Sequence, residues 1–524
     1  MITWLASPPQ TDLTPPRLLW RDSLICLLLG VISGFASSPR HLWPVVVVCL
    51  TGFFYALLKQ SGWRAGLLGF AFGLGWFAVL VSWLQVVGVE AWVGLTIVCA
   101  IPLAIVGALC SRVGVLTLGP VWMSSVWVAG EAVRDRFPFG GFPWGRLSFA
   151  TGSQADQVLS FGGPTYVSFL MCLGAALTAV IARRMRLDRS SLSADVVVAM
   201  AIGLVAVSMV WIPQTQDGPE VGSLKVAVIQ GGVPGQGLDF LGRARTVTRN
   251  HAKQTVLLAQ AIKAGKQPKP DLVVWPENST DLDPRLDGET RAIVQSAVDA
   301  IGVPILLGAV LEVGNQRLAN AAVLWNPQTG PRVVYTKQRP VPFGEFLPYR
   351  DQISGLSDKF ALLPKDFVAG IESGQITVKD VRLGIVICFE VTHDDVVHAA
   401  VRDGGEVLVV LTNNATYAAT DQPEQQFDVT RQRAVEFARP VVVAATTGIS
   451  AVINPEGNVT TSLAQNRGGY FVTSVQGSSQ ITTQARYGVG LELFFVMLAI
   501  LAIAIRVIIR PIRSPEERVE QETS

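Results

Sequence analysis

The sequence predicts two structural parts: an α-helical transmembrane bundle of about eight spans, and an α/β domain of αββα layers held outside the cytoplasm. Three observations predict this division. First, the chain is 50% apolar and only 16% charged, whereas an average soluble domain carries roughly 25% charge. Second, basic residues cluster in every second connection between the apolar segments. Third, a long polar section alternates short Val- and Ile-rich runs with amphipathic segments.

Eight apolar segments are the predicted spans, and several approach the roughly 20 residues that a helix needs to cross a bilayer. The first is short, and a secretory signal is the alternative for that stretch. Further spans follow it along the chain, which favours a membrane helix. The segments lie at about residues 23–36, 42–58, 65–87, 91–110, 113–133, 158–181, 194–212 and 488–505.

The basic residues orient this bundle. Under the positive-inside rule, basic connections lie in the cytoplasm, which places both termini there and the polar section outside. Arg134, Arg136 and Arg146 fall on the outer side and argue against this orientation, but they are fewer than the basic residues that support it. The orienting residues are Arg17, Arg21, Lys59, Arg64, Arg112, Arg183, Arg184, Arg186, Arg189, Arg506, Arg510, Arg513 and Arg518.

These patterns predict a multi-pass protein of the cytoplasmic membrane with four successive regions. They are a membrane bundle with spans 1–7 (residues 1–213), an extracytoplasmic catalytic domain (214–487), a final membrane span (488–510) and a cytoplasmic tail (511–524).

The polar section predicts a layered αββα domain, because buried Val/Ile runs of this length with helices between them are typical of sheets covered by helices. Its predicted helices are residues 243–263, 289–300 and 424–438. Its predicted strands are residues 225–230, 272–275, 305–310, 322–325, 333–335, 383–387, 407–411, 441–445 and 451–453.

Composition excludes several classes of function. The formal net charge of +2 and the lack of a long basic run argue against nucleic-acid binding. Of the six cysteines only Cys388 lies in the polar section, which excludes a disulfide framework and a CxxC metal site there. With four histidines in the chain, a zinc site is poorly supported. No metal and no organic cofactor is required.

Three polar residues share one local context. Glu277 follows the apolar run 272–276, Lys337 follows 333–336 and Cys388 follows 383–387. Each stands at the C-terminal end of a predicted strand, the edge where α/β sheets present ligand-binding groups. If the three strands are neighbours, the side chains converge.

The chemistry of the three groups is complementary. An ordinary thiol is mostly protonated at neutral pH. A carboxylate such as Glu277 takes that proton as general base while the sulfur attacks a carbonyl. An ammonium such as Lys337 stabilises the developing oxyanion or holds the carboxylate in place. Water or an amine then resolves the thioester.

Each residue also has a simpler interpretation. A cysteine after a Val/Ile strand is more often a small buried hydrophobe, and Glu277 with Lys337 is more often a surface ion pair. A Cys–His dyad with His393 is a further catalytic alternative. His393 lies only five residues after Cys388 and is expected to enter the next helix. Spacing alone therefore suggests a cysteine acyl-transfer site and no more.

Several short motifs resemble a known family. The segments 275–278 (Trp-Pro-Glu-Asn), 335–337 (Tyr-Thr-Lys) and 387–390 (Ile-Cys-Phe-Glu) are similar, in the same order, to the three signatures of the nitrilase, or carbon–nitrogen hydrolase, superfamily. Further segments resemble the apolipoprotein N-acyltransferases of that superfamily, and with them the resemblance covers nearly the whole chain. They are residues 141–144, 342–348, 413–416 and 433–436.

The resemblance implies a nitrilase-like domain with Cys388 as nucleophile, Glu277 as general base and Lys337 as oxyanion-stabilising residue. It also implies that Glu345 positions the lysine or the acyl intermediate, and that Glu390 supports the site from beside the nucleophile. For Glu390 a structural hydrogen bond in the turn is the alternative.

The activity that the resemblance implies is transfer of an acyl chain from a phospholipid, through a thioester on Cys388, to the N-terminal amine of a diacylated apolipoprotein. The implied partners are these two substrates and the lipid bilayer. Two other functions remain open: a membrane-tethered nitrilase-like amidase with the same triad, and a transporter or lipid-binding scaffold. Sparse intramembrane charge argues against transport.

Some features bear on substrate preference. Phe389, Thr416 and Arg339 depart from residues that are common in the family, which leaves the lipid and lipoprotein preference open. Apolar loop residues are candidates for lids or lipid contacts, with packing inside the domain as the alternative: Phe240, Phe343, Phe346, Leu347 and residues 360–363. The Gly-rich segment 137–145 is expected to form a flexible loop at the mouth of the bundle.

Overall fold

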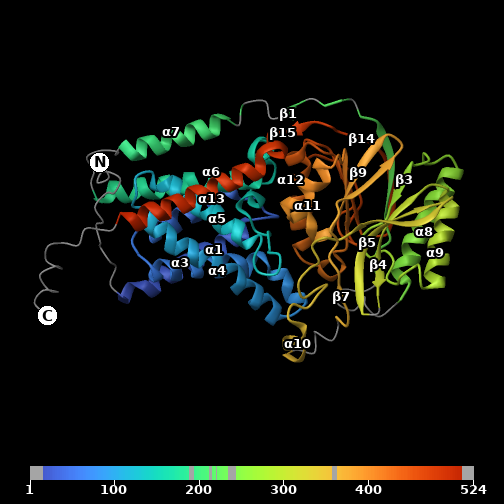
Figure 1. The fold of residues 1–524 in the computed structure, drawn as a ribbon, viewed down its shortest axis with the longest axis horizontal. Helices are drawn as coiled ribbons and strands as arrows, with labels where there is room; N and C mark the ends of the chain where they lie inside the picture. The colour runs from blue at the N-terminus through green and yellow to red at the C-terminus, as the bar shows by residue number, and fades with distance from the viewer. Residues whose placement is uncertain are drawn as a thin grey trace, which may run out of the picture.

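The computed structural model describes residues 16–187, 194–209, 211, 215–216, 218–219, 221–233, 244–314, 316–356 and 363–509. Within these ranges the chain forms a helical part and then an α/β part, and its last helix returns alongside the helical part (Figure 1). The predicted fold class is confirmed in these terms. The predicted tail 511–524, the lid candidates Phe240 and 360–362, and the basic residues Arg189, Arg510, Arg513 and Arg518 lie outside the described residues.

The helical part has a helix at each of the eight predicted segments. Five described stretches are long and apolar enough to cross a membrane: Leu19–Ala36, Trp63–Leu80, Val89–Val113, Gly152–Arg186 and Thr483–Ile508. The count of eight spans stays a prediction. The helices are α1 (Pro16–Ala36), α2 (Trp43–Leu57), α3 (Trp63–Leu80), α4 (Val89–Val113), α5 (Gly119–Arg134), α6 (Asp156–Leu187), α7 (Ala194–Met209) and α13 (Thr483–Ile508).

Several helix boundaries differ from the prediction for local reasons. α1 begins at Pro16, whose fixed φ suits the first turn of a helix, so it is longer than the apolar segment alone indicated. α3 ends at Leu80, and a separate 3-10 turn, Ser82–Val86, replaces the rest of the predicted span. α6 is interrupted at Gly163, which has φ +66° and precedes Pro164, because proline clashes with the turn before it.

The α/β part contains two large sheets. One has the order β14-β2-β3-β4-β5-β6, with β7 paired to β5, and the other has the order β13-β12-β11-β10-β9-β8. The first comprises β2 (Ser223–Gln230), β3 (Leu272–Val274), β4 (Ile305–Val313), β5 (Arg317–Asn326), β6 (Gly330–Thr336), β7 (Asp366–Phe367) and β14 (Gly469–Gln476). The second comprises β8 (Gly374–Val378), β9 (Val381–Ile387), β10 (Val407–Thr412), β11 (Val441–Ala445), β12 (Ala451–Ile453) and β13 (Val459–Ser462).

The two sheets pack face to face between two layers of helices, as Figure 1 shows. In β9, Leu383, Ile385 and Ile387 lie in the core between the sheets, while Val386 faces the helices outside, as the period of two along a strand requires. α8 (Thr246–Lys263) and α9 (Gly288–Ile301) cover the first sheet. α11 (Asp394–Arg402) and α12 (Gln422–Phe437) cover the second. The αββα prediction is therefore confirmed.

Each large sheet contains three neighbouring parallel strands. β2, β3 and β4 run parallel to one another, and so do β9, β10 and β11. A short pair, β1 (Thr215–Gln216) with β15 (Ile481–Thr482), lies at the start of α13. Sequence reasoning gave no ranges for β8, β13, β14 and α11. The three strands mix polar and apolar residues without strict alternation. α11 has a clear amphipathic pattern, with its valines buried, and the sequence predicts it only as the helix that His393 enters.

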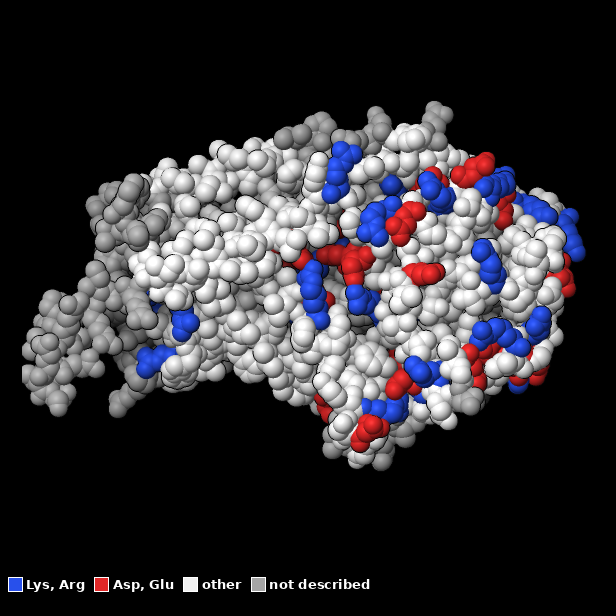
Figure 2. Space-filling model, in the orientation of Figure 1, with Lys and Arg blue, Asp and Glu red and all other residues white. Residues whose placement is uncertain are grey.

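Buried ion pairs join the helical part to the layer formed by α11 and α12. Arg146, in the segment between α5 and α6, donates to Asp135 (2.6 Å) and to Asp394 (2.6 Å). Arg433 of α12 donates to the other oxygen of Asp394 (2.7 Å) and pairs with Glu436 (2.5 Å). Figure 2 shows that charged side chains otherwise gather on the α/β part, while most of the visible helical face is uncharged.

Substituting Asp394 tests this junction. Asp394→Asn leaves Arg146 and Arg433, whose side chains are 4% and 1% exposed, without their shared carboxylate. Breaking a buried pair costs about 3–5 kcal/mol, so we expect a loss near the lower end of that range. The measurement is thermal unfolding of the purified protein in detergent. The adjacent Asp395→Asn is the control, because its ion pair is exposed and worth at most about 1 kcal/mol; equal losses would contradict the assignment.

Candidate active site

Glu277 lies directly after β3 and is buried, with 3% exposure. Its Oε1 accepts hydrogen bonds from Asn320 Nδ2 (2.7 Å) and Lys337 Nζ (3.1 Å). Its Oε2 accepts one from the backbone N–H of Asn413 (2.8 Å). The close approach of this segment to β4 requires Gly308, where a Cβ would lie 2.5 Å from the Cα of Glu277. The carboxylate is therefore held in one orientation.

Lys337 lies directly after β6 and is buried, with 1% exposure. Its ammonium donates to Glu277 Oε1 and to Glu345 Oε1 (3.0 Å). Burial disfavours the charged form, but the neighbouring carboxylates of Glu277 and Glu345 outweigh it and raise the pKa of Lys337 well above its ordinary value. The lysine is therefore a fixed positive charge inside the site.

Cys388 directly follows β9 and begins a 3-10 turn, Cys388–Thr392. Its φ of +54° is left-handed, which is strained for a residue with a Cβ. Thr412 Oγ1 donates to its Sγ (3.3 Å), and Gln426 Nε2 donates to Thr412 Oγ1 (2.8 Å). Burial, and then the charge of Glu277, raise the pKa of the Cys388 thiol to about 12. The resting nucleophile is therefore a thiol that needs a base.

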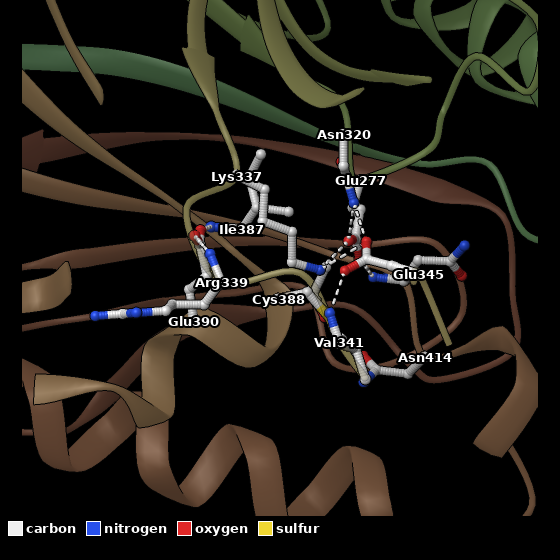
Figure 3. A network of polar contacts seen from close by, with 12 residues as sticks. Glu277, Asn320, Lys337, Arg339, Val341, Glu345, Ile387, Cys388, Glu390 and Asn414 are labelled. Carbon is white, nitrogen blue, oxygen red and sulfur yellow. Dashed lines mark hydrogen bonds and ion pairs between the residues drawn. The ribbon is translucent and has the colours of Figure 1, made fainter. Parts of the chain in front are cut away.

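The three predicted residues converge, but their strands are not neighbours. β3 and β6 belong to one sheet, with β4 and β5 between them, and β9 belongs to the other sheet. Face-to-face packing of the two sheets brings the three ends together. In Figure 3 the Cys388 side chain lies beside the end of Lys337, next to the carboxylates of Glu277 and Glu345.

Glu345 and Asn320 complete this cluster. Glu345 Oε2 accepts from the backbone N–H of Val341 (2.7 Å), while its Oε1 accepts from Lys337 and from Asn320 Nδ2 (2.7 Å). Asn320 thus donates to both carboxylates from β5. The geometry agrees with the implied role of Glu345 in positioning the lysine.

Glu390 does not take part in the carboxylate–lysine cluster. Its carboxylate accepts from the hydroxyl of Tyr335 (2.9 Å) and from the backbone N–H groups of Ile387 (2.9 Å), Gln338 (2.5 Å) and Arg339 (3.0 Å). Burial raises its pKa to about 7. These bonds tie the turn that carries Cys388 to the strand end that carries Lys337, so both expectations for Glu390, support and structural hydrogen bonding, describe the same contacts.

The alternative dyad finds no support in the geometry. The Cys388 thiol has Thr412, Gln426 and the backbone of Asn413 as hydrogen-bond partners, rather than His393. His393 lies just before α11 and packs edge-on against Phe389, with ring centroids 5.1 Å apart. Burial lowers the pKa of His393 to about 4, so the imidazole is uncharged at neutral pH.

The catalytic turn rests on the helical part. Phe389, next to the nucleophile, stacks on Phe142 and Trp144 of the segment 137–145, with ring centroids 5.8 and 6.2 Å away. Gln425 of α12 accepts from the indole N–H of Trp144 (2.8 Å) and of Trp83 (3.1 Å). The sequence predicts a flexible loop at the mouth of the bundle for the segment 137–145; these contacts anchor its second half.

The apolar loop residues predicted as lids or lipid contacts differ in their surroundings. Phe343 is 50% exposed and meets Phe139 edge-on, with ring centroids 6.0 Å apart. Phe346 lines a cleft next to the site. Leu347 is 3% exposed, so it packs inside the domain.

Sequence reasoning missed Asn320, Thr412 and Gln426. Asn320 is a single polar residue inside the apolar run of β5, and Thr412 ends the apolar strand β10. A polar residue inside a buried strand was the available signal. Gln426 carried none, because the neighbouring positions of α12 are also polar.

The arrangement suits covalent acyl transfer. It combines a thiol, an adjacent carboxylate and a buried ammonium, which are the parts of base-assisted nucleophilic attack with oxyanion stabilisation. Within the described ranges, no group of three or more His, Cys, Asp and Glu residues is placed to hold a metal ion.

Known proteins match both parts of the chain. Residues 29–177 match the family model described as the apolipoprotein N-acyltransferase N-terminal domain, and residues 225–484 match the carbon-nitrogen hydrolase model. An apolipoprotein N-acyltransferase of Mycolicibacterium smegmatis is 34% identical over 91% of this chain and 84% of its own length. One from Azotobacter vinelandii is 26% identical over 85% and 87%.

Among solved structures, an amidase of the nitrilase superfamily from Nesterenkonia AN1 is similar to part of the chain. The alignment covers 49% of this chain and 92% of the amidase, with a TM-score of 0.35 and 16% identity.

Two substitutions should shift the pKa of the Cys388 thiol in opposite directions. The charge of Glu277 raises the thiol pKa, whereas the hydrogen bond from Thr412 lowers it. At a fixed pH below the thiol pKa, Glu277→Gln should therefore speed alkylation of Cys388, and Thr412→Val should slow it. The measurement is the rate of iodoacetamide labelling at pH 8, with Cys388→Ala as the blank. Acyl transfer should nevertheless fall about 10²-fold or more in Glu277→Gln, because the general base is gone. Shifts of the same sign in both variants would contradict this electrostatic picture.

Proposed function

This chain belongs to the apolipoprotein N-acyltransferase family, a family of enzymes with a carbon–nitrogen hydrolase domain, and we propose that it acts through a thioester on Cys388. The observation that carries this proposal is the buried ammonium of Lys337, shared by Glu277 and Glu345 beside the thiol. With its apolar helices the chain is a membrane protein.

In the first step, Cys388 attacks the acyl ester of a phospholipid. Glu277 takes the thiol proton as the carbon–sulfur bond forms, and Lys337 stabilises the oxyanion on the former carbonyl. The carbon–oxygen bond then breaks, Glu277 returns the proton to the leaving alkoxide, and a lysophospholipid departs. A base is required because the pKa of the thiol lies near 12, which leaves little thiolate at neutral pH.

In the second step, the N-terminal amine of the diacylglyceryl-cysteine of an apolipoprotein attacks the thioester. Glu277 removes a proton from the amine as the carbon–nitrogen bond forms. The carbon–sulfur bond then breaks, which leaves an amide, and Glu277 returns the proton to the sulfur of Cys388. The acceptor is now triacylated, and the enzyme returns to its starting state. Each half-reaction uses the same base and the same ammonium.

The helical part has a physical purpose in this reaction. Both substrates carry acyl chains, and moving a chain out of lipid costs about 0.8 kcal/mol per CH₂. Phe142 and Trp144 of the bundle contact Phe389, next to the nucleophile. The active site therefore lies against the part of the protein that meets lipid, and the substrates need not leave the bilayer.

Trapping the acyl-enzyme tests the chemistry. Purified protein incubated with phospholipid should gain one acyl group on Cys388, detected by mass spectrometry and released by hydroxylamine, and Cys388→Ala should gain none. Addition of a diacylated lipopeptide should move that group to the peptide amine. If instead free fatty acid accumulates and the peptide stays unmodified, the amidase alternative is correct. If Cys388→Ala acylates the peptide normally, the mechanism is wrong.

The division into residues 1–213, 214–487, 488–510 and 511–524, with the catalytic domain outside the cytoplasm, is part of the proposal and rests on the basic connections. Leu286 of the α/β part is 70% exposed, and Ser61 is exposed between α2 and α3. In a Cys388→Ala background, a membrane-impermeant maleimide should label Leu286→Cys in intact cells. It should label Ser61→Cys only after permeabilisation. The reverse pattern would refute this orientation.

A further inference from the structure

A cleft of about 220 Å³ lies beside the nucleophile. Phe389, the residue after Cys388, forms part of its lining together with His393. Residues 139–141 of the helical part form one wall, and residues of the segment that follows Lys337 form another. A group bound in this cleft would therefore lie between the mouth of the bundle and the thiol.

Two nitrogen atoms of the residues that line the cleft are buried without a hydrogen-bond partner: Arg339 Nε and His393 Nε2. Their neighbour Gln338 is already engaged, because its Nε2 donates to the carbonyl of Glu372 (3.0 Å). Arg339 Nε is a donor, and His393 Nε2 is one in the tautomer that carries the proton there. A buried donor without an acceptor is costly, and a ligand rich in acceptor oxygens would remove that cost. Arg339 and His393 are not part of the catalytic cluster described above.

The charge at the cleft favours an anion. The guanidinium of Arg339 is permanently charged, and it forms an ion pair with Asp395. Both side chains are exposed, by 41% and 57%, and such surface pairs contribute little, so an oxyanion can replace the carboxylate readily. Two other acids lie nearby. Asp394 is held by Arg146 and Arg433, and Glu390 is occupied by the hydroxyl of Tyr335 and by three backbone N–H groups.

The Arg339 side chain points away from the catalytic cluster, so a substrate group that it binds would lie some distance from the reacting carbonyl. In Figure 3 its side chain extends away from Glu277, Lys337 and Glu345, with Cys388 between them in this view. Of the two proposed substrates, the phospholipid carries a phosphate a few bonds from its ester, and the diacylglyceryl-cysteine does not. The aromatic rings of Phe346 and Phe367 in the lining suit the glycerol and the first methylenes.

We propose that this cleft binds the phosphodiester of the acyl donor, with Arg339 as the principal donor and His393 Nε2 as a second. The inference rests on the proposed function. Because Arg339 Nε is covered in this conformation, the partly exposed side chain turns its Nε edge toward the cleft when the phosphate enters. Arg339 is then a residue that selects phospholipids over uncharged acyl esters.

The experiment compares two donors in the same detergent micelles: a phospholipid and a diacylglycerol with identical acyl chains. The quantity measured is the ratio of their kcat/KM values for thioester formation on Cys388. Arg339→Gln should lower this ratio at least tenfold, through a higher KM for the phospholipid, and His393→Phe should lower it less. Arg402→Gln is the matched control, because Arg402 is exposed and pairs with the adjacent Asp403 away from the cleft.

Removing Arg339 leaves Asp395 unpaired, so repulsion of the phosphate by Asp395 must be separated from loss of binding. The double variant Arg339→Gln/Asp395→Asn should keep the lowered ratio; recovery of the wild-type ratio would overturn the proposal. If Arg339→Gln forms no thioester from either donor, Arg339→Met is measured instead, because it also removes the charge, and an unchanged ratio there also overturns the proposal. Wild-type protein that forms no thioester from phospholipid refutes the proposed function itself, whereas an unchanged ratio in an active Arg339→Gln refutes only the phosphate site.

Free phosphate would offer the same chemistry as a lipid headgroup. Inorganic phosphate is therefore added to the diacylglycerol reaction, against chloride of equal ionic strength. A lipid site predicts no effect specific to phosphate. An effect present in wild-type protein and absent from Arg339→Gln would assign the cleft to the free anion and overturn the lipid assignment.

Discussion

The buried ammonium of Lys337 is the constraint on which the active site depends. A charge removed from water is tolerated only with close partners of opposite charge and filled hydrogen bonds. Glu277 and Glu345 supply the charge, and Asn320 bridges the two carboxylates. These partners come from the end of β3, the middle of β5 and the loop after β6. Their meeting point therefore requires the sheet to form before the site exists.

Two further interactions place the nucleophile against that charge. Glu390 closes the turn at Cys388 and binds the backbone that follows Lys337, so it joins one sheet to the other. Arg433 donates to the carbonyls of Val391 and Thr392 at the end of the same turn, and through Asp394 it reaches Arg146 of the helical part. The left-handed Cys388 is thus held from both the α/β part and the bundle.

The same contacts explain how the active site of the α/β part is held against the apolar helical part. α12 presents Gln425 to Trp83 and Trp144, and Phe389 stacks on Phe142. Aromatic stacking and buried ion pairs hold their geometry better than exposed ones, because solvent does not compete for them. These interactions therefore join the site firmly to the helical part.

Sequence alone determined the positions where local pattern is strong. The apolar segments, the Val/Ile strands and the placement of Glu277, Lys337 and Cys388 at strand ends follow from periodicity and composition, which are properties of neighbouring residues. The mixed patterns of β8 and β14 carried too little contrast to reveal those strands. α11 is clearly amphipathic, and its pattern predicted a helix after Cys388 without fixing its bounds. The span boundaries near Gly163 and Leu80 depended on backbone geometry that hydropathy does not register.

Only the tertiary structure decided how the catalytic groups meet. The sequence left open whether the three strands are neighbours. Two stacked sheets bring Cys388 to Glu277 and Lys337, because sheet order and sheet packing are set by contacts between residues far apart in the chain. The roles of Asn320, Thr412 and Glu390 also emerged there, since a hydrogen bond between distant segments leaves no local trace. Composition and motif thus pointed to the candidate reactive groups, and the fold supplied their burial and alignment.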